Sequence, residues 1–137
     1  MYAGYKPSFP EVADVSPNEV VALQQELGPE LVLVDVREPR EREVSMLPGA
    51  ISREQFDARR DELAGRTVVA YCTIGYRSGR FADELRKAGV DARNLKGSIL
   101  AWSHAGLPLV AGGEPTRRLH VYGADWDLAA EGYETVW

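Results

Sequence analysis

The chain has very little cysteine, histidine or methionine, and no hydrophobic run approaches the length of a membrane span. Its one cysteine, Cys72, excludes an internal disulfide and argues against a cysteine-based zinc cluster, which agrees with a reducing compartment. Residues 1–10 lack the basic start and apolar core of a signal peptide, so we expect a cytoplasmic protein. His104 and His120 have no second ligand at a metal-binding spacing, and we therefore expect no metal.

Acidic and basic side chains are present in similar numbers. The 137 residues carry 16 basic and 21 acidic side chains, and the net charge of −5 gives no general reason to expect nucleic acid or an anionic membrane as a partner. A hydrophobic fraction of 45% and a charged fraction of 27% are ordinary for a soluble globular protein. The length suits one domain, which can bury about two thirds of its unfolded surface.

Short apolar runs alternate with segments of helical periodicity along the chain. The runs predicted to form buried strands are residues 31–36, 67–71 and 90–94. The predicted helical segments are residues 16–28, 52–65 and 79–89, each of which ends at a glycine. Ser16 and Ser52 are the expected caps, because Glu19 and Gln55 complete a capping box three positions later. This alternation implies an α/β fold with a central, mainly parallel sheet and helices on both faces.

Cys72 follows the strand predicted at residues 67–71 and precedes a helix, so residues 72–77 form the bend between them. The first turn of a helix favours negative charge, and a thiol there beside a cation such as Arg77 is placed to become a thiolate, the nucleophilic form. Gly75 permits a backbone conformation in which successive N–H groups turn toward the sulfur. A lone cysteine at the end of an apolar strand is also a common inert core residue, and the two interpretations are about level on these residues alone.

Three motifs resemble a known family. The loop CTIGYRS at residues 72–78 is similar to the active-site loop of single-domain rhodanese-like sulfurtransferases, which has a cysteine, two variable residues, glycine, a variable residue, arginine and serine. Upstream, VLVDVREPRE and LPGAI resemble the first motif of that family, and downstream LKGSILAWSHAGLPL resembles its closing motif. The three motifs occur in the family's order and cover most of residues 16–110, which we interpret as a rhodanese-like domain. The resemblance independently implies the same α/β fold.

The resemblance also implies a function. Cys72 would attack the outer sulfur of a donor such as thiosulfate, release sulfite and hold the sulfur as a persulfide, which a thiophilic acceptor such as cyanide or a thiol would remove. Loop amides would cradle the terminal sulfur. Arg77 would either bind the anionic donor or stabilise the loop, and no cofactor is needed. The substrate-binding loop would comprise Thr73, Ile74, Gly75, Tyr76, Arg77 and Ser78, with Thr73, Ile74 and Tyr76 at its variable positions.

Asp35 and Arg37 leave the strand predicted at residues 31–36 at the same sheet edge as Cys72, because parallel strands place their carboxyl ends together. Either a functional or a framework role could explain them. We favour the framework role, in which the carboxylate pairs with the arginine or with loop amides and supports the edge. Residues 38–43 are predicted to be a solvated turn of mixed charge.

The chain departs from the family pattern at two places. Where many relatives have Gly-His-Ile before Pro-Gly-Ala, this chain has Ser45, Met46 and Leu47, so any contribution of that histidine is absent. Ser98 replaces the usual second glycine of the closing motif. We expect this serine to cap a short helix and to change only the local backbone geometry.

Two other functions fit the same loop. Phosphatases and arsenate reductases also use a cysteine and an arginine around an anion-binding loop, but related phosphatases have five residues between them, whereas Cys72 and Arg77 enclose four. The tighter loop suits a single sulfur atom better. A non-enzymatic interaction module on the same fold is the second alternative, and the presence of Cys72, Gly75 and Arg77 weighs against it.

The two ends lie outside the motifs. Residues 1–15 are predicted to be an extended N-terminal arm, residues 111–115 a linker, and residues 119–122 a short strand. The C-terminal extension, residues 111–137, includes Trp126, Tyr133 and Trp137, which are costly to leave in water. We expect this extension to pack on the domain or on a partner subunit, and the second arrangement would give a homodimer.

Overall fold

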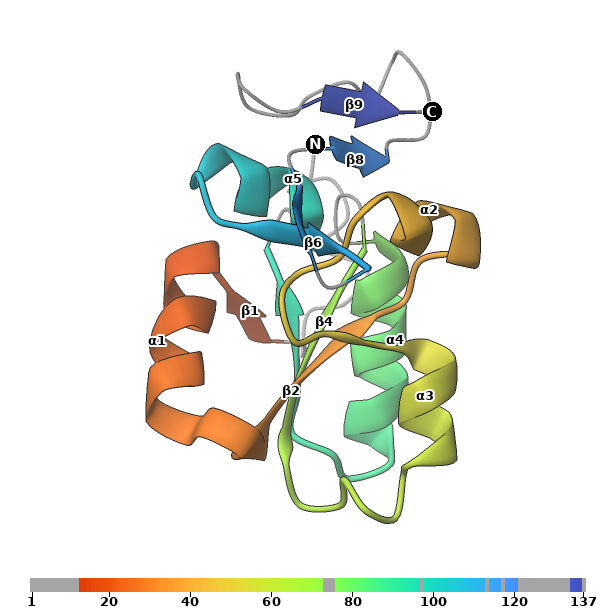
Figure 1. The fold of residues 1–137 in the computed structure, drawn as a ribbon. Helices are drawn as coiled ribbons and strands as arrows, with labels where there is room; N and C mark the ends of the chain where they lie inside the picture. The colour runs from red at the N-terminus through yellow and green to blue at the C-terminus, as the bar shows by residue number, and fades with distance from the viewer. Residues whose placement is uncertain are drawn as a thin grey trace.

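The computed structural model describes residues 13–72, 76–96, 98–112, 114–116, 118–120 and 134–136. Its centre is a five-stranded sheet in the order β1-β5-β4-β2-β3, in which all neighbouring strands are parallel (Figure 1). The strands are β1 (Ala13–Val15), β2 (Leu31–Asp35), β3 (Ile51–Ser52), β4 (Thr67–Tyr71) and β5 (Ala92–Leu95). The predicted parallel sheet is therefore confirmed. Residues 13–15, which the sequence analysis placed in the N-terminal arm, form its edge strand.

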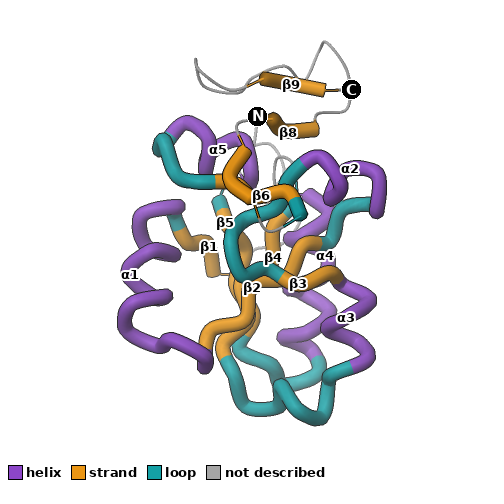
Figure 2. Tube along the Cα trace, viewed as in Figure 1, coloured by secondary structure: helices purple, strands orange, loops and turns teal. Residues whose placement is uncertain are grey.

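Helices lie on both faces of the sheet, as predicted (Figure 2). They are α1 (Pro17–Leu27), α2 (Pro39–Val44), α3 (Arg53–Ala58), α4 (Tyr76–Lys87) and α5 (Ser98–His104), with a 3-10 turn at Gly28–Glu30. One apolar cluster joins α1 and α5 to the sheet, and a second cluster joins α3 and α4 to the opposite face. None of the helices that the structure describes combines the length and the hydrophobicity that a membrane-spanning helix needs.

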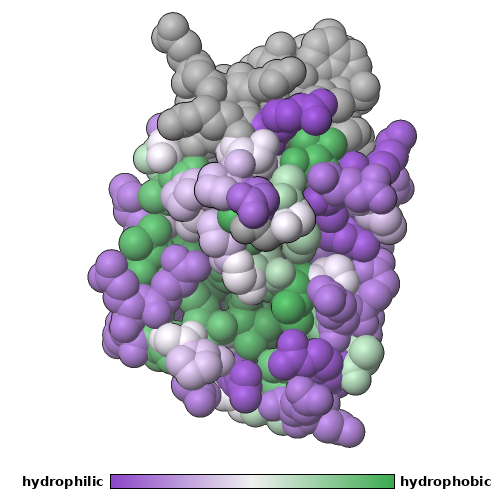
Figure 3. Space-filling model, in the orientation of Figure 1, coloured by the Kyte–Doolittle hydropathy of each residue, from purple (hydrophilic) through white to green (hydrophobic). Residues whose placement is uncertain are grey.

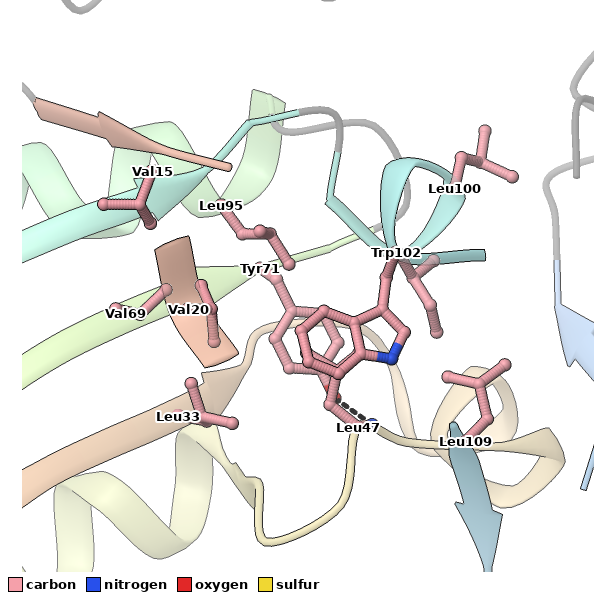
Figure 4. Packing of buried hydrophobic residues seen from close by; sticks show 11 residues of the cluster. Val15, Val20, Leu33, Leu47, Val69, Tyr71, Leu95, Leu100, Trp102 and Leu109 are labelled. Carbon is pink, nitrogen blue, oxygen red and sulfur yellow. Dashed lines mark hydrogen bonds between the residues drawn. The ribbon is translucent and has the colours of Figure 1, made fainter. Parts of the chain in front are cut away.

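The first apolar cluster includes the two large rings of Tyr71 and Trp102 (Figure 4). The Trp102 indole N–H donates to the carbonyl of Pro108 at 2.8 Å, so its one polar group is satisfied. In the second cluster, Phe56 and Phe81 pack edge to face with ring centroids 5.8 Å apart. In the space-filling view, hydrophilic side chains cover the left and right margins, where α1 and α3 lie in Figure 1, and apolar surface shows between them (Figure 3).

The starts of α1 and α3 follow the predicted capping signals, whereas the end of α3 and the start of α4 differ from the prediction. Ser16 and Ser52 both form capping boxes. However, α3 ends at Ala58 rather than Gly65, because residues 57–62 are all exposed and supply no apolar side chain to hold another turn on the core. In addition, α4 begins at Tyr76 instead of Gly79, which shortens the bend after Cys72.

The segment predicted as a linker is a hairpin, in which β6 (Leu109–Ala111) pairs antiparallel with β7 (Glu114–Thr116). Main-chain bonds between Met46 and Val110, 2.8 and 2.9 Å long, join β6 to the segment after α2. Pairing on both sides explains why this stretch is ordered despite its small residues. Beyond it, β8 (Arg118–His120) pairs with β9 (Glu134–Val136). Trp126, Tyr133 and Trp137 lie outside the described residues.

Candidate active site

Cys72 lies directly after β4, at the carboxyl edge of the sheet, and is only 1% exposed. Helix α4 begins four residues later, so Arg77 and Ser78 belong to its first turn. The predicted cradle comprises the amides of residues 73–78; of these, residues 73–75 lie outside the described residues, as does the side chain of Tyr76. The described part of the site therefore consists of the cysteine and the elements that surround it.

Two serine hydroxyls lie near the Cys72 sulfur. The hydroxyl of Ser78 lies 3.4 Å from Sγ and that of Ser98 lies 4.0 Å from it, both within hydrogen-bonding range of a sulfur acceptor. The Ser78 hydroxyl has a single proton, for which the Asn94 amide oxygen, 2.6 Å from Oγ, is the nearer acceptor. Hydroxyl protons can rotate toward an anionic acceptor, so this arrangement can stabilise negative charge on the sulfur.

The Arg77 guanidinium is held by Glu41 of α2. Its two Nη atoms lie 2.8 and 3.1 Å from the two carboxylate oxygens of Glu41, which is fully buried. The Glu38 amide donates to the same carboxylate at 2.7 Å. Burial raises the pKa of Glu41, but the bonds from Arg77 and the Glu38 amide outweigh it, and the pKa lies below its usual value. Glu41 is therefore a buried anion that orients Arg77.

This pair corrects the prediction for residues 38–43, which are not a solvated turn. They include most of α2, which starts with Pro39 in its first turn and has a capping box between Glu38 and Glu41. Glu38, Pro39 and Arg40 are exposed, whereas Glu41 is not. The prediction failed because the partner that makes burial of Glu41 favourable, Arg77, is 36 residues away in the chain.

Asp35 and Arg37 form a second buried ion pair at this edge. Arg37 Nη2 and Nε lie 2.6 and 2.9 Å from the Asp35 carboxylate, and both side chains are fully buried. The Tyr71 hydroxyl donates to the same carboxylate at 2.7 Å. Burial lowers the pKa of Arg37, but the hydrogen bonds to Asp35 and the charge of its carboxylate outweigh this effect. The pKa of Arg37 is therefore raised above its usual value. This geometry favours the framework role over a chemical one.

The framework extends to the segment that departs from the family pattern. Arg37 Nη2 donates to the carbonyl of Ser45 at 2.5 Å, and the amide of Leu47 donates to the Tyr71 hydroxyl at 3.1 Å (Figure 4). Burial, followed by the charge of Asp35, raises the pKa of Tyr71 well above its usual value, so the phenol stays protonated and keeps donating. Ser45 and Leu47 thus connect β2, β4 and the loop before β3.

An open pocket of about 310 Å³ adjoins the first turns of α4. Its lining residues are Val36, Arg53, Arg77, Arg80, Phe81 and Glu84. Arg53 lies 3.5 Å from Glu84 and stacks over the Phe81 ring, with its guanidinium carbon 4.8 Å from the ring centroid. Three guanidinium groups and one carboxylate line the pocket, and the Glu41 carboxylate behind Arg77 leaves a smaller positive excess, which suits an anion. A larger pocket of about 500 Å³ lies at the opposite edge of the sheet, where Gly65 precedes β4 and Gly89 precedes β5.

Within the described ranges, no three histidine, cysteine, aspartate or glutamate side chains converge in a way that could hold a metal ion. His104 is an exposed residue at the end of α5, and the side chain of His120 lies outside the described residues. The described site thus offers a thiol, hydroxyl groups and guanidinium groups, which suit chemistry on an anionic substrate.

Sequence reasoning located part of this site. It identified Cys72, Arg77 and Ser78 on one loop and placed Asp35 and Arg37 at the same edge of the sheet. It missed three polar residues that complete the site, which are Glu41, Asn94 and Ser98. A signal existed only for Ser98, because it stands where the family motif has glycine.

Comparison with known proteins identifies relatives of the chain. A family model described as a rhodanese-like domain matches residues 16–105, which include every residue of the site described above. The chain is 37% identical over 86 residues to a sulfurtransferase from Allochromatium vinosum, a match that spans 60% of this chain and 80% of that protein. It is also 37% identical over 100 residues to the uncharacterized protein slr1261 from Synechocystis sp., which spans 70% of this chain and 55%, about half, of that protein's length. Among solved structures, thiosulfate sulfurtransferase from Pseudomonas aeruginosa matches with a TM-score of 0.68 and 25% identity, over 91% of this chain and 24% of that chain.

Proposed function

The chain belongs to the rhodanese-like domain family, and we propose that it transfers sulfane sulfur from a donor such as thiosulfate to cyanide or a thiol through a persulfide on Cys72. The single observation that carries the proposal is the position of Cys72, which is buried at the strand-to-helix junction with the Ser78 hydroxyl 3.4 Å from its sulfur. The names of two similar proteins, a sulfurtransferase and a thiosulfate sulfurtransferase, support it.

The reaction proceeds in two displacement steps. In the first, the thiolate of Cys72 forms a bond to the outer sulfur of thiosulfate, the S–S bond of thiosulfate breaks, and its electron pair leaves with sulfite. In the second, the acceptor attacks the terminal sulfur, and the electron pair of the breaking S–S bond returns to Cys72 as thiolate. Cyanide becomes thiocyanate, and a thiolate becomes a persulfide. Negative charge lies on sulfur in both resting forms, where the Ser78 hydroxyl can donate to it.

The arginine-lined pocket that adjoins α4 supports the proposal that the sulfur donor is an anion. Arg77 is held by Glu41, but its side chain remains 27% exposed and lines the pocket together with Arg53 and Arg80. A dianion such as thiosulfate would gain charge-assisted contacts there before its outer sulfur reaches Cys72. In this arrangement the guanidinium group that pairs with Glu41 would also contact the donor.

The first test is mass spectrometry of the intact protein after incubation with thiosulfate. We expect an increase of about 32 Da on Cys72, which is one sulfur atom, and its loss as thiocyanate when cyanide is added. The Cys72→Ser protein is the matched control, because a hydroxyl replaces the thiol in a side chain of the same connectivity and the sulfur nucleophile is lost. Equal turnover by Cys72→Ser would refute the proposal.

An aryl phosphate, used as a second substrate, tests the two alternatives to sulfur transfer, which are a phosphatase and a non-enzymatic interaction module. The four-residue spacing between Cys72 and Arg77 makes a smaller loop than phosphatases use, so hydrolysis of an aryl phosphate should stay at background. Phosphate release by the unaltered protein that Cys72→Ser abolishes would favour the phosphatase instead. Absence of both sulfur transfer and phosphate release would favour an interaction module.

A further inference from the structure

Ser98 has an unusual backbone conformation. Its φ is +51°, and among the residues that the structure describes it is the one non-glycine residue with positive φ. A side chain with a Cβ atom is strained in this region, which glycine occupies without cost. A serine here is thus less stable than a glycine unless its hydroxyl makes contacts that offset the strain.

The hydroxyl of Ser98 makes such contacts, and they converge on Cys72. Ser98 is fully buried, and its Oγ accepts a hydrogen bond from the Cys72 amide at 3.1 Å. The next residue, Ile99, donates its own amide to the Cys72 carbonyl at 3.1 Å. Two consecutive residues at the start of α5 therefore hold the main chain of Cys72 from both of its polar groups, although α5 lies 26 residues further along the chain.

The single proton of the Ser98 hydroxyl has three described acceptors within reach. The carbonyl oxygen of Leu95 is the nearest at 3.2 Å from Oγ, the Ser78 hydroxyl oxygen lies at 3.4 Å, and the sulfur of Cys72 lies at 4.0 Å. A neutral thiol is a weak acceptor, so the proton then belongs on Leu95. An anionic sulfur is a much stronger acceptor and draws the proton toward itself, while Oγ continues to accept from the Cys72 amide.

We propose that Ser98 is a positioning residue of this site, which fixes the backbone of Cys72 and supplies a second hydroxyl donor to the anionic sulfur beside Ser78. The inference deepens the proposed function, on which it rests for its role in sulfur transfer, since both the thiolate and the persulfide are anionic. The proton stays on the Ser98 oxygen throughout, and no bond to Ser98 is made or broken. The strained backbone is the cost of placing this hydroxyl near the sulfur; with a glycine at residue 98, Ser78 would be the one hydroxyl donor left among those that the structure describes.

The test uses alkylation of the intact protein by iodoacetamide, measured as a function of pH. Cys72 is the chain's one cysteine, so the rate reports this thiolate without any assumption about sulfur transfer. Ser98→Ala removes the hydroxyl but keeps the Cβ atom and its strain, whereas Ser98→Gly removes both. We expect the midpoint of the pH profile to rise in both variants by about half to one unit, equivalent to a roughly threefold to tenfold loss of thiolate below the midpoint.

Denaturant unfolding distinguishes this role from general support of α5. Ser98→Gly should be more stable than Ser98→Ala, because the strain is relieved, and yet show the same shift in alkylation. Ser103→Ala is the matched control, since Ser103 is also fully buried in α5 and its hydroxyl donates to the Leu100 carbonyl at 2.7 Å, as that of Ser98 does to Leu95. This control should lose stability and leave the alkylation profile in place.

A profile of Ser98→Gly that superimposes on that of the unaltered protein would overturn the inference, even if Ser98→Ala failed to fold. An equal shift in Ser103→Ala would also overturn it, because loosening of α5 would then explain the effect. If the unaltered protein transfers no sulfur but the shift is present, the role of Ser98 toward the thiolate stands and the proposed function fails.

Discussion

The buried pair of Glu41 and Arg77 offers a quantitative test of how the site is held together. Glu41→Gln removes the charge of the carboxylate but keeps its shape and one acceptor oxygen. In the folded protein Arg77 would then face a neutral amide across the contacts that are now 2.8 and 3.1 Å long. We expect the variant to fold and to be clearly less stable at pH 7.

The magnitude follows from the burial of the two partners. Removing one member of a fully buried ion pair typically costs about 3 to 5 kcal/mol, because the other charge is left without compensation. Arg77 is 27% exposed and regains some hydration, and the glutamine oxygen still accepts one bond, so we expect a loss of about 2 kcal/mol. At an m-value of about 2 kcal/mol per M, the midpoint of urea unfolding should fall by about 1 M.

The loss should also depend on pH in a defined direction. The pKa of Glu41 is lowered in the folded protein, whereas the unfolded chain has the ordinary value of about 4.3. The unfolded state therefore binds more protons in the interval between these two values, and folding stability falls as the pH falls through it. The stabilisation by the pair is fully present above the ordinary pKa. The difference between the unaltered protein and Glu41→Gln should therefore shrink below about pH 4.3.

The control is Glu62→Gln, which neutralises a carboxylate in an exposed ion pair. Glu62 lies 3.1 Å from Arg59, and the two side chains are 68% and 46% exposed. Such pairs contribute at most about 1 kcal/mol, so the urea midpoint should hardly move. If Glu41→Gln were no less stable than Glu62→Gln, or if its deficit persisted unchanged to pH 3, the buried pair would not have the role that its geometry indicates.

Two further predictions concern the framework and the tail. Tyr71→Phe should lower the free energy of unfolding by about 1 to 3 kcal/mol, because it leaves the Asp35 carboxylate and the Leu47 amide without the phenolic hydroxyl. Urea unfolding would measure this change. A loss below about 0.5 kcal/mol would contradict the prediction. Deletion of residues 123–137 should lower the melting temperature or change the oligomeric state, as measured by calorimetry and sedimentation, because we propose that Trp126, Tyr133 and Trp137 pack on the domain or on a partner subunit. Unchanged stability together with rapid amide exchange throughout residues 123–137 of the intact protein would contradict this packing.

The features that could be predicted from sequence are those encoded over a few neighbouring residues. The capping boxes at Ser16 and Ser52 each join a residue to one three positions later, so a short window contains the whole signal. The run that forms β4 is apolar on both faces, as a central parallel strand requires. Once three such strands were placed, the topology of parallel sheets brought Asp35 and Cys72 to the same edge.

The features that could not be predicted depend on partners far away in the chain. Glu41 lies in a highly charged segment, and by local pattern alone it resembles its exposed neighbours Glu38 and Arg40. Its burial becomes favourable only after α4 brings Arg77 within hydrogen-bonding distance. The hairpin of β6 and β7 was likewise missed, because its small residues indicate a linker until Met46 supplies main-chain partners for Val110.

Ser98 shows why a motif can locate a site and still leave its chemistry incomplete. The substitution of serine for the motif's glycine was visible in the sequence, and capping was a reasonable local interpretation of it. The direction of its hydroxyl, however, depends on a φ of +51° that serine rarely adopts, and no local preference predicts a disfavoured conformation. That conformation is retained in a position where the hydroxyl meets the Cys72 amide, 26 residues away. The strain at a residue whose hydroxyl bonds to Cys72 is therefore the observation on which we base the proposal that this departure concerns the reactivity of the cysteine.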